Sequence, residues 1–128
     1  MSAILSPDGK YSVVKQDDFD EIAMGSPQFG HVSISGAKGQ IPNDEYGEVI
    51  LWSPDSRFVA LEALVEVRPT FRTKLVVVEM PRCVVFTVRV QSQGTVTPVR
   101  WEGSTRLIYT TWSVGVPREN FEWDAPSF

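Results

Sequence analysis

A seven-residue segment that occurs twice constrains the fold of this chain most strongly. Leu5-Ser6-Pro7-Asp8-Gly9-Lys10-Tyr11 returns 47 residues later as Trp52-Ser53-Pro54-Asp55-Ser56-Arg57-Phe58. A degenerate third copy, Trp101-Glu102-Gly103-Ser104-Thr105-Arg106-Leu107, begins 49 residues after Trp52. In the first two copies proline restricts φ and aspartate is suited to accept hydrogen bonds from the amides that follow it, which reverses the chain. The recurrence predicts a unit of strand, turn and strand that is used repeatedly.

Alternating and β-branched residues extend this prediction along the chain. Strands are expected over 10–15, 31–35, 48–52, 57–67, 73–80, 84–91, 96–101 and 106–112, and the short connections favour an antiparallel meander. Within 84–91, Val84, Phe86, Val88 and Val90 are expected to face the core. The carboxylates of 17–21 favour a helical turn, and 114–128 has no regular period. No helix longer than about two turns is predicted.

Length and composition favour one small domain that spans residues 1–128. Its 42% hydrophobic content and seven Phe, four Trp and three Tyr are sufficient for one packed core. The first residues lack a basic and apolar signal segment, and the apolar runs are too short for a membrane span. A lone cysteine, Cys83, fits a reducing compartment. We therefore expect a cytoplasmic protein that does not act at a membrane.

The Ser-Pro-Asp-Gly/Ser turns resemble the repeats of TolB-type and tryptophan-aspartate-type β-propellers. The matching pieces are Leu5 to Val14, Trp52 to Leu61 with its partner strand Leu75 to Met80, and Trp101 to Thr110. The resemblance implies blade-like sheets and gives Asp8 and Asp55 the role of turn formers. Closure needs about four to eight blades, more than this chain supplies. The expected fold is therefore all-β, with antiparallel meanders forming a β-sandwich or a stack of propeller-blade-like sheets and little helix.

The candidate catalytic and metal-binding residues are few. Cys83 is expected to be packed and His31 to lie on the surface, and one histidine with one cysteine does not supply a zinc site. The 17–21 run lacks the spacing of a calcium loop. Glu62, Glu66 and Glu79 are expected to form cross-strand ion pairs rather than to act as acid and base. The sequence thus predicts no metal, no cofactor and no catalytic residues, hence no enzyme activity.

Charge is distributed unevenly along the chain. Residues 1–56 hold nine carboxylates against three lysines, residues 57–118 hold nine basic residues against four carboxylates, and residues 119–128 add three carboxylates. The basic middle interleaves with aromatics, a pattern that can bind single-stranded nucleic acid. The overall pI near 4.9 argues against that partner. An acidic face instead suits a basic protein.

These features favour a non-enzymatic protein-binding module, in its sharpest form an immunity protein that neutralises a basic toxin by direct binding. It would act as a monomer or small homo-oligomer. The alternative is a propeller-like scaffold or subunit that self-assembles or joins a larger β protein. A third interpretation is a small enzyme or ligand carrier whose pocket is lined by Trp52, Trp101, Trp112 and Tyr109. The predicted partner-binding residues are Asp17, Asp18, Asp20, Glu21, Asp44, Glu45, Glu48, Glu122, Trp123 and Asp124.

Overall fold

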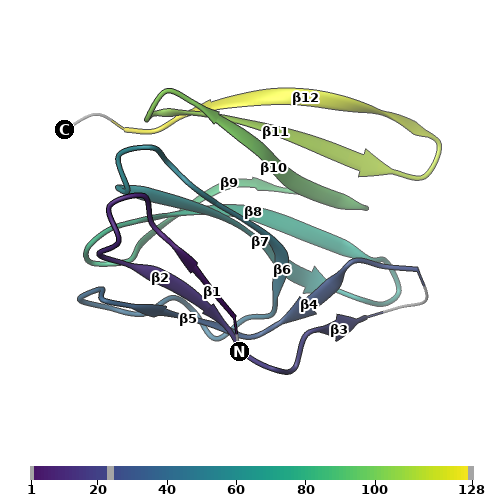
Figure 1. The fold of residues 1–128 in the computed structure, drawn as a ribbon. Helices are drawn as coiled ribbons and strands as arrows, with labels where there is room; N and C mark the ends of the chain where they lie inside the picture. Colours follow the sequence, from purple (N-terminus) through teal and green to yellow (C-terminus); the bar gives the residue numbers. More distant parts are fainter. Residues whose placement is uncertain (1, 23–24, 127–128) are drawn as a thin grey trace.

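The chain forms three antiparallel sheets that lie in layers, and none of them closes into a barrel (Figure 1). The computed structural model describes residues 2–22 and 25–126. The first sheet has the order β1-β2-β5, the central sheet β3-β4-β6-β7-β8-β9, and the third sheet β10-β11-β12. This confirms the all-β prediction, and no helix occurs in the described residues.

The described residues form twelve strands. They are β1 Ser2–Leu5, β2 Ser12–Lys15, β3 Asp20–Glu21, β4 Gln28–Gly30, β5 Val32–Ser35, β6 Tyr46–Trp52, β7 Phe58–Glu66, β8 Arg72–Glu79, β9 Val84–Val90, β10 Thr95–Glu102, β11 Arg106–Ser113 and β12 Val116–Asp124. The three copies of the repeated segment join β1 to β2, β6 to β7 and β10 to β11. Each sheet therefore contains one copy of the hairpin.

The central sheet separates two hydrophobic cores. Because side chains alternate along a strand, Phe58 and Ala60 of β7 face the third sheet whereas Val59 and Leu61 face the first. All four residues are fully buried. A strand that is apolar on both faces must lie between two layers, and this explains why the 57–67 run has almost no polar alternation.

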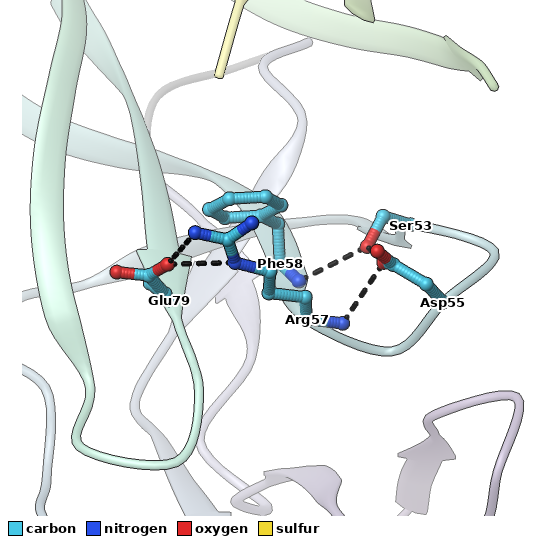
Figure 2. Close-up of polar contacts among 5 residues, drawn as sticks. All are labelled: Ser53, Asp55, Arg57, Phe58 and Glu79. Carbon is cyan, nitrogen blue, oxygen red and sulfur yellow. Dashed lines mark hydrogen bonds and ion pairs between the residues drawn. The ribbon is translucent and has the colours of Figure 1, made fainter. Parts of the chain in front are cut away.

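The first two turns share one hydrogen-bonding pattern, which Figure 2 shows for the second copy. Ser53 Oγ donates to Asp55 Oδ1 at 2.7 Å and accepts from Phe58 N at 3.0 Å, while Arg57 N donates to Asp55 Oδ1 at 3.1 Å. In the first copy, Ser6, Asp8, Lys10 and Tyr11 make the corresponding contacts. Both aspartates thus have the turn-forming geometry that the sequence predicts.

The sheets are joined to each other by a contact that also repeats. Trp52 Nε1 of the central sheet donates to Ile4 O of the first sheet at 3.0 Å, and Trp101 Nε1 of the third sheet donates to Leu51 O of the central sheet at 3.0 Å. The same indoles stack on Tyr11 and Phe58, the residues that follow the turn in the preceding sheet. The tryptophans of the repeat therefore fix the spacing of the layers.

Both ends of the stack depart from this contact. In the first sheet the tryptophan position is occupied by Leu5, which is 66% exposed. In the third sheet the hairpin is one residue shorter, because Trp101 pairs with Leu107 whereas Trp52 pairs with Val59. By strand register Arg106, and not the aligned Leu107, therefore takes the place of Phe58, and it pairs with Asp124 at 3.2 Å and with Glu122 at 3.8 Å. Like the polar outer face of a capping repeat, these ion pairs suit the outer face of the third sheet to water.

Three local predictions are wrong. Residues 17–21 form a turn followed by β3 instead of a helical turn, and residues 116–124 form β12 although no strand was expected there. On β9, Phe86 and Val88 pack against the core, but Val84 and Val90 are exposed. A register shift between β8 and β9 places Arg89 opposite the buried Leu75, and Val90 opposite Lys74, so the alternation of faces changes before Val90.

Candidate protein-binding surface

Seven of the predicted site residues gather along one border of the central sheet, which we name the acidic edge: Asp17, Asp18, Asp20, Glu21, Asp44, Glu45 and Glu48. They come from the segments 17–21 and 44–48, which lie far apart in the sequence. Strand β4 brings the two segments together because it pairs with β3 on one side and with β6 on the other (Figure 1). Gln28 N of β4 donates to Glu48 Oε1 at 3.2 Å across this junction.

The first segment of the acidic edge is held by His31 and Gly30. Asp18 accepts a hydrogen bond from His31 N at 3.0 Å, and its carboxylate pairs with His31 Nδ1. This pairing lowers the pKa of Asp18 and raises the pKa of His31. Phe19 packs against Gly30 so closely that a Cβ at this glycine would overlap the ring. The acidic edge is therefore structured, and His31 lies on the surface as predicted.

A hollow of about 360 Å³ opens beside the acidic edge. Asp17 and Glu48 line it from the two acidic segments, together with Phe19 and Lys15. The Lys15 ammonium lies 5.3 Å from the centroid of the Phe19 ring, a cation–π distance. The Phe19 ring thus already carries a cation of this chain, and it is the carboxylates of Asp17 and Glu48 that are suited to receive a lysine or arginine side chain from another protein.

The remaining predicted site residues, Glu122, Trp123 and Asp124, lie elsewhere, on β12 of the third sheet. Trp123 packs against Phe86, with ring centroids 6.1 Å apart, and Phe121 stacks on Tyr109. Glu122 and Asp124 face Arg106. The C-terminal aromatics thus cap the sheet, and the structure does not bring this part of the predicted site to the acidic edge.

The other reactive side chains have structural partners. Cys83 is buried in the core beside the first sheet, its thiol donates to Gly39 O at 3.4 Å, and burial raises its pKa. Arg57 pairs with Glu79 at 2.6 Å and lies over the Phe58 ring (Figure 2). Glu66 accepts from Thr70 and lies 3.8 Å from Arg72. Within 2–22 and 25–126, no three His, Cys, Asp or Glu residues are grouped to hold a metal.

Glu62 differs from the expected cross-strand ion pair. It is only 5% exposed, and it accepts hydrogen bonds from Thr73 Oγ1 at 2.6 Å and from Thr97 Oγ1 at 3.1 Å. Thr73 in turn accepts from Val96 N at 3.0 Å, so the carboxyl group links the central sheet to β10. Burial raises the pKa of Glu62, and the two hydroxyl donors offset part of the rise.

Replacing Glu62 with glutamine is expected to stabilise the protein at neutral pH. Because the folded state holds the Glu62 proton more tightly than the unfolded chain, this group favours folding below its unfolded pKa near 4.5. That contribution is lost as pH rises through the raised pKa. Glutamine keeps an acceptor for Thr73 and carries no charge, so we expect a gain of roughly 1 kcal/mol at pH 7. Urea unfolding at pH 5 and pH 7.5 measures it, and an equal effect at both pH values would contradict the assignment.

No protein family, curated protein or solved structure matches this chain. In the part of the chain that the structure describes, no helix is long and apolar enough to cross a membrane.

Proposed function

We propose that this chain is a non-enzymatic protein-binding module whose acidic edge binds a basic protein, and that the partner is a toxin that the chain neutralises. The observation that supports the proposal is the meeting of two acidic segments around a hollow that contains Phe19, Asp17 and Glu48. A field of one sign raises the rate at which an oppositely charged partner associates. The Phe19 ring, which carries the Lys15 ammonium, lines the same hollow and adds apolar contact area.

The layered fold suits this role because it presents the surface on a rigid support. The central sheet that carries Glu45 and Glu48 at its border is packed on both faces. A binding surface on such a support loses little conformational freedom when the partner docks. A protein that neutralises a toxin by covering its active surface needs a preorganised contact of this kind and needs no catalytic residues.

Affinity capture from the native host, followed by mass spectrometry, tests this function. We expect one stoichiometric partner of basic pI that is toxic when it is expressed alone and harmless when it is co-expressed with this chain. Light scattering on the free protein is expected to give a monomer or a small homo-oligomer. Recovery of no partner, or of a partner that is not toxic, would contradict the neutralising role.

A propeller-like subunit is the second candidate, and the repeated tryptophan contact between sheets favours it. Extension of the stack would place a further layer against Leu5 or against Arg106, neither of which carries the tryptophan or the aromatic ring of the repeat. The outer faces therefore lack the side chains with which a further sheet would repeat this contact. A discrete ring-sized homo-oligomer in the same light-scattering experiment would favour the propeller-like subunit over the toxin-binding module.

A further inference from the structure

A pocket of about 580 Å³ lies between the central and third sheets, at the ends of their strands. Its volume is within the range of pockets that hold small ligands, about 300–1,000 Å³. The β7–β8 turn, the β9–β10 connection, the β11–β12 hairpin and the segment before β4 each contribute to its wall. It shares no residue with the acidic edge, and of the four aromatics of the ligand-carrier interpretation, Trp112 is the one that lines it.

The pocket wall is held in place by backbone contacts. Gly94 N donates to Phe71 O at 2.8 Å, and Gly94 O accepts from Thr73 N at 3.1 Å. Phe71 is in turn supported edge-on by the buried Phe29, with ring centroids 6.0 Å apart. The aromatic side of the pocket is therefore formed before any ligand arrives, which lowers the entropic cost of binding.

The chemistry of the lining is apolar with one cation. Pro27, Pro69, Phe71 and Val114 line the pocket together with Trp112, which is 39% exposed although it is a large aromatic residue. Arg118 is the charged residue of the lining. Among the described residues Arg118 has no carboxylate partner within ion-pair distance, whereas Arg57, Arg72, Arg100 and Arg106 each have at least one. An exposed aromatic beside an unneutralised guanidinium suits an anionic ligand with an apolar body.

We propose that this pocket binds an apolar carboxylate, with the aryl or branched alkyl group of the ligand against Trp112 and Phe71 and its carboxylate on Arg118. The same chemistry is offered by a free organic acid and by the C-terminal residue of a peptide. This site is independent of the acidic edge, so it stands or falls separately from the proposed function.

Titration with defined probes tests the pocket. We expect 4-phenylbutyrate to shift one tryptophan indole N–H signal in the NMR spectrum saturably, with a Kd of about 1 mM or tighter for so small a ligand. The neutral amide of the same acid is expected to bind at least about fivefold more weakly, because it lacks the charge that Arg118 complements. Equal binding of acid and amide, or no saturable shift, would overturn the proposal.

Three variants locate the binding. Arg118→Gln is expected to reduce the affinity for the acid to that for the amide and to leave the affinity for the amide unchanged. Trp112→Ala should remove the shifted signal and weaken the binding of both probes by at least about tenfold. The backbone N–H signals of the rest of the protein should stay unchanged. Arg82→Gln, at an exposed arginine outside the pocket, is the control and should change neither affinity. An equal effect of Arg82→Gln and Arg118→Gln would overturn the site.

A peptide ending in phenylalanine with a free carboxylate, compared with its C-terminal amide, distinguishes the two sources of the ligand. Tighter binding of the free-carboxylate peptide than of 4-phenylbutyrate assigns the pocket to chain termini. Tighter binding of 4-phenylbutyrate assigns it to free organic acids.

Discussion

Replacing Gly94 with alanine is expected to lower the free energy of unfolding by about 3 kcal/mol. Gly94 has φ +87°, and the left-handed region costs a residue with a Cβ about 1–2 kcal/mol. A Cβ at this position would also overlap the backbone carbonyl oxygen of Trp112. Since a backbone group cannot turn aside like a long side chain, the β9–β10 connection must shift, and overpacking of this kind adds about 1–3 kcal/mol.

Gly103 provides the matched control for this prediction. It also has positive φ, +64°, but a Cβ there would meet no heavy atom within 4 Å. Gly103→Ala should therefore carry the conformational cost alone, about 1 kcal/mol. Urea unfolding of the two variants separates the collision from the backbone preference. Equal losses for both variants would show that the Trp112 carbonyl does not constrain the connection between the central and third sheets.

The regular part of the fold could be predicted from the sequence because its signals are local. The strands of the central meander follow from β-branched runs between short turns, and the observed β7, β8 and β9 differ from the predicted ranges by one residue at most at each end. Asp8 and Asp55 also follow from local chemistry, because each bonds an amide two residues further on.

Two parts of the structure were not predicted, for different reasons. Strand β12 is mostly exposed and carries charges throughout, and it forms because the turn after Ser113 places it against β11. Its alternation of Phe121 and Trp123 with Glu122 and Asp124 was a usable signal. Glu62 carried no such signal, since its two hydroxyl donors come from Thr73 and Thr97 on other strands.

The acidic edge could be predicted from the sequence only in part. Its two segments stand out as runs of carboxylates in the sequence, but their meeting depends on β4, a strand of three residues between Pro27 and His31. So short a strand has no periodicity to detect. The Arg118 pocket was equally hidden, because four connections far apart in the sequence contribute to its wall.

Reversing charge on the acidic edge is expected to weaken partner binding by about 100-fold or more. The variant Asp17→Lys, Asp20→Lys, Glu48→Lys changes three carboxylates that lie on the two segments of the edge. Close charge pairs across interfaces have coupling energies of about 1.5 kcal/mol or more, and each 1.4 kcal/mol is a factor of ten in Kd. All three side chains are exposed, but Asp20 and Glu48 each lose a hydrogen bond from a backbone amide, so we expect the free energy of unfolding to fall by only about 1 kcal/mol.

The third sheet supplies a control with the same change in net charge. Glu102→Lys, Glu119→Lys, Glu122→Lys alters three exposed carboxylates on β10 and β12, in a different layer from the central sheet that carries the acidic edge (Figure 1). This variant has the same effect on long-range attraction through net charge but leaves the acidic edge intact. A loss confined to the first variant therefore identifies a contact surface on the acidic edge, whereas equal losses would contradict a contact confined to that edge.

The measurement that tests the central claim most directly is the dissociation constant of the captured partner for the original chain and for these two triple variants, at one ionic strength. The acidic-edge proposal predicts a Kd raised about 100-fold or more by Asp17→Lys, Asp20→Lys, Glu48→Lys and changed far less by the third-sheet variant. An unchanged Kd for the acidic-edge variant would contradict the claim that this surface binds the partner.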